Sequence, residues 1–300
     1  MASAEPFEPD PDHAGGGMGG NEILPILVRR SAKPRKTDVA VTIILRKVLL
    51  GCVLTGVLCL FWQGLVTLFA PPPYILPGPV QVLTALAENW TYLFENAAIT
   101  ALEIGLGLLA GIGLGVATAL SMAAFPALTR VVLPVLIVTQ ALPVFAIAPL
   151  LVLWFGYGLA SKVVMATLII YFPVASAFFD GLRRTDPGLL DLADLYRVAP
   201  LQRLLQFRLP AALPGLVSGV RVAAAVAPIG AIVGEWVGSS AGLGFVMLHA
   251  NARIQTDVMF AALFILAAMA VALRLLIEFL TRDLVSWAPE SNRQSIPSIQ

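Results

Sequence analysis

The sequence has little charge for its length. Asp, Glu, Lys and Arg make up 12% of its 300 residues, whereas hydrophobic residues make up 58% and the mean hydropathy is +0.87. Soluble domains carry about 25% charged residues, so this composition excludes an ordinary water-soluble domain. The charges of the basic and acidic residues nearly cancel, which leaves a net charge of +1. This net charge by itself indicates neither a basic nor an acidic partner.

Metal ligands and catalytic motifs are also scarce. Cys52 and Cys59 lie on one apolar stretch, about 10 Å apart along a helix axis and beyond disulfide reach. The two histidines, His13 and His249, are far apart in sequence, so we expect no metal site. There is no G-x-x-x-x-G-K-[ST], H-E-x-x-H or G-x-S-x-G motif. We predict that the chain is not an enzyme and cannot itself hydrolyse ATP.

Long stretches without charged residues make up most of the sequence. A helix that crosses a bilayer needs about 20 mostly apolar residues. The stretches predict an all-α integral membrane protein with six transmembrane helices, at residues 48–70, 97–122, 129–155, 160–182, 216–238 and 257–281. The third of these contains Pro134, Pro143 and Pro149, which we expect to kink it.

The distribution of Lys and Arg predicts the orientation. All of these residues except Lys162 and Arg253 fall on one side of the six helices. Because basic residues collect on the cytoplasmic side, both termini are expected to be cytoplasmic. The predicted organisation is a disordered cytoplasmic tail (1–45), a first helix with an extracytoplasmic segment (46–96), a five-helix core (97–282) with a cytoplasmic loop (183–215), and a C-terminal tail (283–300).

Small residues recur at helical spacing in the second predicted helix. Gly107, Gly111 and Gly115 are four residues apart, which lets another helix backbone approach closely. The spacing favours helix packing within the fold; a contact with another subunit is the alternative.

The loop between the fourth and fifth helices has the most informative pattern. Asp186-Pro187 is typical of a helix start, with a capping carboxylate before a first-turn proline. The segment 188–197 alternates apolar and charged residues, and a second short amphipathic stretch, 200–208, is expected to end at Leu209-Pro210. Two short surface helices indicate a docking element for a partner's groove, although a connector lying on the membrane is an alternative.

This loop resembles the coupling motif of the permease subunits of bacterial ATP-binding-cassette importers: E-A-A, three residues, G, nine residues, I-x-L-P. Asp191-Leu192-Ala193 stands at E-A-A, Arg197 at the glycine, Phe207 at the isoleucine and Leu209-Pro210 at the end. The resemblance implies that Asp191, Ala193, Arg197, Phe207, Leu209 and Pro210 couple the chain to an ATPase. An arginine in place of glycine leaves open how the turn is made.

The same resemblance implies the fold and the partners. It predicts a type I importer permease fold in the cell inner membrane, with both termini cytoplasmic. Two copies would form the path as a homodimer, cytoplasmic ATPase subunits would bind the ATP, and an extracytoplasmic solute-binding protein would deliver a small molecule. The chain would need no cofactor of its own and would bind no nucleic acid.

Further segments resemble particular branches of this family. Residues 76–79, 150–158 and 172–173 look like the sulfonate, nitrate and taurine branch, whereas 141–149, 234–244 and 247–256 are similar to permeases for hydroxymethylpyrimidine, a thiamin precursor. We therefore predict a pyrimidine solute, with a sulfonate, nitrate or taurine-like anion as the alternative. A secondary carrier or a membrane enzyme is more remote, because the sequence lacks clear inverted repeats and clustered catalytic side chains.

Polar residues in or beside the apolar helices are candidates for the translocation path or its gate. These are Gln140, Glu235, Trp236, His249 and Asn251. The alternatives are a helix–helix hydrogen bond for Gln140, an interfacial anchor for Glu235 and Trp236, and a solvated loop for the other two. Glu103, in the second predicted helix, could simply face the headgroups. Trp154 and Tyr171 could stack on a flat solute.

Overall fold

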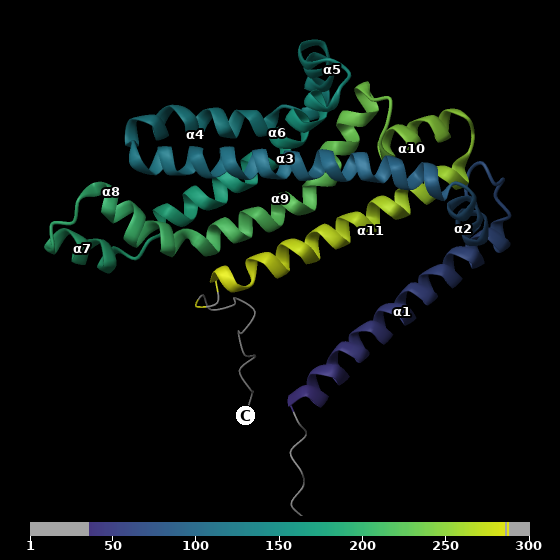
Figure 1. Ribbon diagram of the computed structural model, residues 1–300, viewed down its shortest axis with the longest axis horizontal. Helices are drawn as coiled ribbons and strands as arrows, with labels where there is room; N and C mark the ends of the chain where they lie inside the picture. The colour runs from purple at the N-terminus through teal and green to yellow at the C-terminus, as the bar shows by residue number, and fades with distance from the viewer. Residues whose placement is uncertain (1–35, 286, 288–300) are drawn as a thin grey trace, which may run out of the picture. The chain divides into compact units, whose positions relative to one another are not determined.

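The computed structural model describes residues 36–285 and residue 287, and Figure 1 shows them as helices joined by short turns. The first helix, α1 (Lys36–Phe69), begins inside the segment expected to be a disordered tail; residues 1–35 of that segment lie outside the described residues. The chain divides into two units, Met1–Gly56 and Val57–Gln300. The helices from α2 to α11 all belong to the second unit.

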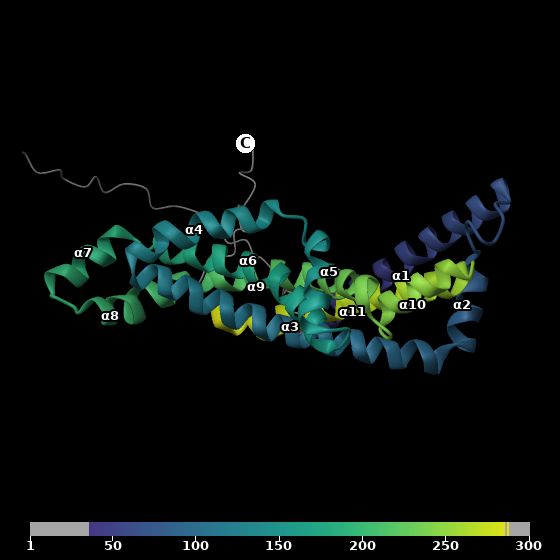
Figure 2. The ribbon, with the colours of Figure 1, turned by 90° about the horizontal axis from the view of Figure 1, so that it is seen from above.

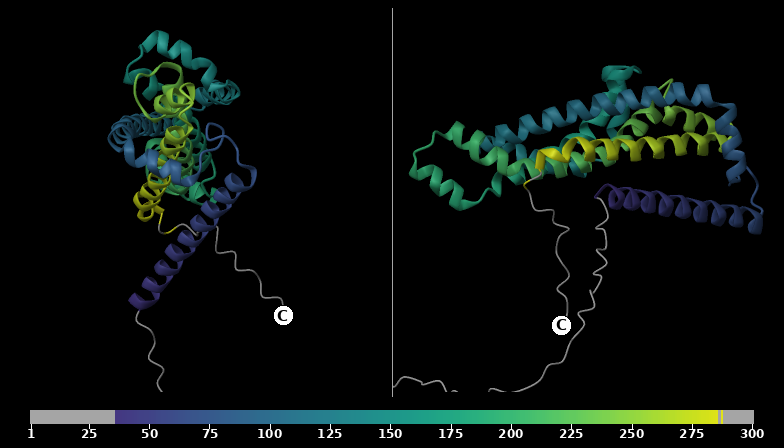
Figure 3. Two further views of the ribbon diagram at one scale, coloured as in Figure 1. Left: turned by 90° about the vertical axis from the view of Figure 1, so that its right-hand side faces the viewer. Right: turned by 60° about the horizontal axis from the view of Figure 1, so that its bottom comes forward.

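Four long helices run beside one another in this unit: α3 (Trp90–Ala124), α6 (Leu159–Arg183), α9 (Leu209–Gly238) and α11 (Thr256–Thr281) (Figures 1 and 3). A short helix, α2 (Pro79–Glu88), precedes α3. In the centre, α6 packs against both α3 and α9, and the core between them includes the buried Ile170, Val174 and Ala227. Four of the predicted apolar spans lie within these four helices.

Glycines allow α3 and α6 to approach each other closely. A Cβ atom on Gly107 would lie 2.5 Å from Cβ of Ala166, and one on Gly111 would lie 2.5 Å from Cγ2 of Ile170. A Cβ on Gly113, on another face of α3, would meet nothing within 4 Å. The prediction that this glycine spacing serves helix packing within the fold is therefore confirmed.

The third predicted span is broken rather than kinked. Two helices, α4 (Pro126–Ala141) and α5 (Val144–Phe155), replace the continuous helix expected at 129–155, and their axes differ by 102°. Pro143 has no N–H to donate and disfavours helical geometry at the preceding residue, and Leu142 is extended, with φ −80° and ψ 124°. Pro134 and Pro149, in contrast, lie inside the helices.

The number of membrane crossings depends on this break. Among the described residues, five helices are long and apolar enough to cross a membrane, or six if α4 and α5 form one broken span. The predicted total of six and the predicted orientation of the termini both remain predictions.

The loop after α6 differs in one respect from expectation. It contains α7 (Pro187–Leu195) and α8 (Pro200–Arg203), but α8 does not end at Leu209-Pro210: a π-helical turn, Leu204–Arg208, carries the chain directly into α9. The N–H of Leu209 bonds to the carbonyl of Leu204, one residue further back than in an α-helix. Pro210 follows in the first turn of α9, and the chain remains helical there.

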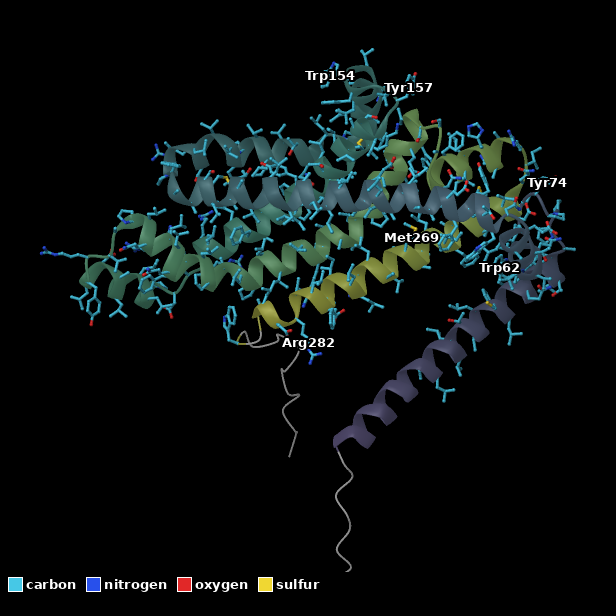
Figure 4. All side chains as sticks on the ribbon, viewed as in Figure 1. Trp62, Tyr74, Trp154, Tyr157, Met269 and Arg282 are labelled. Atoms are coloured by element: carbon cyan, nitrogen blue, oxygen red, sulfur yellow. The ribbon has the colours of Figure 1, made fainter. Side chains whose placement is uncertain are left out.

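The ends of the helix bundle carry different short elements. The pair α7 and α8 lies at one end, and α10 (Leu243–Ala252) lies with α2 at the other (Figures 1 and 2). Arg282 lies at the end of α11 that is remote from Tyr74 and Trp62 (Figure 4). The pair α7 and α8 and the short helix α10 therefore lie toward opposite ends of the bundle (Figures 1 and 2).

Candidate functional site

Three ionisable side chains are buried in the helix bundle. They are Glu103 on α3, Lys162 on α6 and Glu235 on α9, each no more than 2% exposed. Charged groups at membrane depth are costly unless they are paired or hydrogen-bonded. Glu235 was predicted as a path or gate residue, and for Glu103 the burial contradicts the alternative that its side chain faces the headgroups. The distribution of basic residues placed Lys162 only on the side of the helices opposite to most of them, and did not indicate that it is buried.

Glu235 binds the beginning of α10. One carboxylate oxygen accepts a hydrogen bond from the Thr100 hydroxyl, at 2.7 Å, and the other accepts from the Gly244 N–H. The Thr100 hydroxyl in turn accepts from the Leu243 N–H, at 2.8 Å. The Asn96 side chain accepts from the Gly242 N–H, at 2.7 Å. Side chains of α3 and α9 thus satisfy N–H groups that a helix start leaves unpaired.

The position of the Glu235 carboxyl group suits the helix dipole. The N-terminal end of a helix carries a partial positive charge, which a carboxylate stabilises. Gly242, which precedes α10, has a φ of +106°, and a Cβ atom there would collide with the Glu235 carboxylate. Glycine is therefore required at this position by both the backbone conformation and the space.

Lys162 binds the last residue of α9, where the turn that leads into α10 begins. Its ammonium group donates to the carbonyl oxygens of Tyr157, Gly158 (3.0 Å) and Gly238. Gly238 is the last residue of α9, where free carbonyls create a partial negative charge. The stem of Lys162 packs on Gly234, where a Cβ atom would lie 3.3 Å from it. The Lys162 side chain at the end of α9 and the Glu235 side chain at the start of α10 therefore hold the connecting turn in place.

Glu103 is the third of the buried ionisable residues, and it differs from Lys162 and Glu235 in its hydrogen bonding. Its Oε2 atom is buried and has no hydrogen-bond partner among the described residues. The arrangement as a whole fixes α10 and the turn before α6 to the central helices. It positions these elements electrostatically, and among the described residues no three His, Cys, Asp or Glu side chains form a group that could hold a metal ion.

The other predicted path residues lie on exposed surfaces. Gln140 is exposed just before the break between α4 and α5, Trp236 is half-exposed on α9, and His249 and Asn251 are exposed on α10. The His249 ring packs against Phe245, with centroids 4.1 Å apart. Among the described residues, no side-chain hydrogen bond joins these four to one another or to Glu235. Their role in a path remains a prediction.

The two aromatic residues proposed to stack on a solute lie in different surroundings. Trp154 is exposed on α5, which projects from the bundle with Tyr157 at its end (Figure 4). Tyr171 is half-buried on α6, and its hydroxyl donates to the Thr118 hydroxyl at 3.1 Å.

The loop at the other end begins as predicted. Asp186 caps α7, accepting from the Gly188 N–H at 2.8 Å, and Pro187 is the first helical residue. Ala193 is buried, while Leu192, Leu195 and Tyr196 are exposed. Asp191 is also exposed. An exposed apolar group on a short projecting helix is typical of a docking surface.

Arg197 makes the turn that a glycine would make. Its φ is +51°, in the left-handed region that favours glycine. The N–H of Val198 bonds to the Ala193 carbonyl (2.9 Å) and the N–H of Arg197 to the Asp194 carbonyl (3.0 Å), the pattern of a Schellman helix end. The geometry of the turn thus survives the replacement of glycine by arginine.

The remaining residues of the motif lie where the loop enters α9. Phe207 is half-buried in the π-helical turn, and Leu209 and Pro210 begin α9. Arg203, just before this turn, forms an ion pair with Asp194 at 2.5 Å, which ties α8 to α7. The six predicted coupling residues therefore lie on one segment of the chain, which runs from α7 through the π-helical turn into the start of α9.

Comparisons with curated proteins show close relatives over most of the chain. A probable ABC transporter permease of Haemophilus influenzae is 52% identical over 76% of this chain and 93% of its own. A riboflavin transport permease of Chloroflexus aurantiacus is 40% identical (77% and 87% covered), and a formylaminopyrimidine transport permease of Halalkalibacterium halodurans is 33% identical (72% and 86%). More distant relatives include sulfonate and taurine permeases.

A solved structure supports the fold. The inward-facing MetNI methionine ABC transporter contains a chain with a TM-score of 0.53 and 21% identity, covering 65% of this chain and 94% of that one. Residues 111–286 match the family described as "Binding-protein-dependent transport system inner membrane component". The relatives are transport proteins, which confirms that the chain is not an enzyme. This chain therefore belongs to the binding-protein-dependent inner membrane components, the permease subunits of ABC transporters.

Proposed function

We propose that this permease imports a pyrimidine-type solute and is driven by a separate ATPase that docks on α7 and α8. The observation that carries the proposal is the exposed apolar surface of α7, made by Leu192, Leu195 and Tyr196. It lies at the spacing of the coupling motif and at one end of the bundle (Figure 2). Burial of such a patch in a partner's groove would stabilise the complex through the hydrophobic effect.

Two substitutions test the docking surface. Leu195→Asp places a charge on the apolar patch, and Asp191→Lys reverses the charge beside it. Both are expected to abolish co-purification of the co-expressed ATPase while the chain still inserts into the membrane. Glu88→Lys, an exposed charge reversal on α2 at the opposite end, is the matched control. Unchanged ATPase recovery in both loop variants would contradict the assignment.

The proposal includes the arrangement of the complex. Two copies of this chain would form the path at their interface, with the loop and both termini on the cytoplasmic side. A solute-binding protein would deliver the solute from outside. Because that protein selects the solute, few polar side chains are needed along the path itself.

The proposed solute class is supported by two of the relatives. The names of the formylaminopyrimidine and riboflavin permeases both specify flat nitrogen heterocycles, which agrees with the segment resemblances found in the sequence. A sulfonate or taurine-like anion is the second candidate, supported by the sulfonate and taurine permeases among the relatives. Calorimetric titration of the partner binding protein separates the two. Binding of hydroxymethylpyrimidine but not taurine is expected, and the reverse result would replace the first candidate by the second.

A further inference from the structure

A cavity of about 470 Å³ opens at the same end of the bundle as α7 and α8. Its apolar part includes Met122, Leu133 and Phe179. Its charged part consists of three arginines that are distant in sequence: Arg130 on α4, Arg183 at the end of α6 and Arg208 in the π-helical turn before α9. Three separate elements thus bring guanidinium groups to one cavity of ordinary ligand size.

The positive charge of this cavity is not balanced by the chain. No acidic residue lines it, and the one ion pair among the described residues joins Arg203 to Asp194 instead. The Nε atom of Arg208 is buried and has no hydrogen-bond partner among the described residues. Buried donors are normally satisfied, while Arg130 and Arg183 are exposed and line the same cavity. Both observations indicate that an anion belongs there.

The mixed lining specifies the kind of anion. Guanidinium groups bind the oxygens of a phosphate in pairs, with a geometry that a lysine cannot match. Arg183 also lies over the Phe179 ring, 5.6 Å from its centroid, a contact that holds the guanidinium group at the boundary between the apolar and charged parts. A phosphate attached to an apolar group would satisfy both parts at once.

We propose that the Arg130–Arg183–Arg208 cavity binds the headgroup phosphate of an anionic phospholipid. The arginines contact the phosphate oxygens, and the apolar residues contact the glycerol and the first acyl carbons. The placement in the cytoplasmic leaflet, which is rich in anionic lipid, rests on the orientation of the proposed function. The binding itself does not, and it can be measured on the chain alone.

The test uses the full-length chain purified in a neutral detergent. A short-chain phosphatidylglycerol, the matching phosphatidylcholine and inorganic phosphate are each titrated, and retained lipid is measured by native mass spectrometry and thermal shift. Phosphatidylglycerol is expected to bind saturably. Each arginine near a membrane surface strengthens the binding of an anionic lipid about fivefold. Arg208→Gln should therefore weaken phosphatidylglycerol binding about fivefold. Together, Arg130→Gln, Arg183→Gln and Arg208→Gln should weaken it about 100-fold.

Arg184→Gln is the matched control, since this exposed neighbour of Arg183 does not line the cavity. The Arg184→Gln variant should bind phosphatidylglycerol with the affinity of the unaltered chain. Equal binding of phosphatidylcholine, or equal affinity in the triple variant and the control, would overturn the proposal. Saturable binding of inorganic phosphate without that of the lipid would overturn the lipid assignment. Loss of ATPase co-purification in the triple variant with unchanged lipid binding would assign the cavity to the ATPase contact instead.

Discussion

Replacement of Glu235 by leucine tests the buried cap most severely. The substitution removes the acceptors for the Thr100 hydroxyl and the Gly244 N–H without opening a large cavity. Leaving a buried donor without its acceptor costs about 1–3 kcal/mol, so the loss of both acceptors should cost about 2–6 kcal/mol. Most of this cost falls on the attachment of α10, because Gly242–Gly244 have their N–H groups bonded by side chains of α3 and α9.

Hydrogen exchange measures this attachment directly. A local cost of about 3 kcal/mol corresponds to roughly 100-fold faster exchange, since 1.4 kcal/mol is a factor of ten. We expect an increase of about this size for the amides of Gly242–Gly244 in Glu235→Leu. A smaller increase, of about tenfold, is expected in Glu235→Gln, which keeps one acceptor but loses the charge.

The matched control for this experiment is the next residue along α9. Trp236 is half-exposed and makes no side-chain hydrogen bond among the described residues, so Trp236→Leu should leave exchange at 242–244 unchanged. If Glu235→Leu and Trp236→Leu gave the same exchange rates, the assignment of Glu235 as the cap of α10 would be refuted.

Two further substitutions test the packing and the loop. Gly111→Ala should destabilise the chain by about 1–3 kcal/mol, because its Cβ would clash with Ile170, while Gly113→Ala should be neutral or stabilising by up to about 1 kcal/mol; equal unfolding midpoints in detergent would contradict this. Arg197→Gly should stabilise the turn by up to about 1 kcal/mol, since a left-handed non-glycine residue costs about 1–2 kcal/mol. Arg197→Val should destabilise it, and slower exchange in α7 of the valine variant than of the glycine variant would refute the turn assignment.

Local patterns predicted much of the fold. Uncharged length located the long helices, because a membrane helix is defined by composition over about 20 residues. The four-residue spacing of Gly107, Gly111 and Gly115 predicted close packing on α3, and Asp186-Pro187 predicted the start of α7. Each of these features depends on residues within a few turns of one another, so a single sequence is sufficient to find them.

Features made by distant residues could not be predicted in the same way. The bonds from Asn96 and Thr100 to the start of α10 span 146 and 143 residues, and no local pattern relates them. Lys162 was placed only on one side of the helices, because counting charges does not indicate burial. Pro143 breaks a helix while Pro134 and Pro149 lie inside helices, although all three lack an N–H and look alike in the sequence.

Transport in sealed proteoliposomes tests the central claim most directly. The chain is reconstituted with its partner ATPase, and the binding protein and radiolabelled hydroxymethylpyrimidine are added on the side opposite the ATPase. We predict ATP-dependent accumulation that requires all three proteins and is lost in Leu195→Asp, while Glu88→Lys retains it. Accumulation by the chain alone, without ATP or the ATPase, would contradict the account.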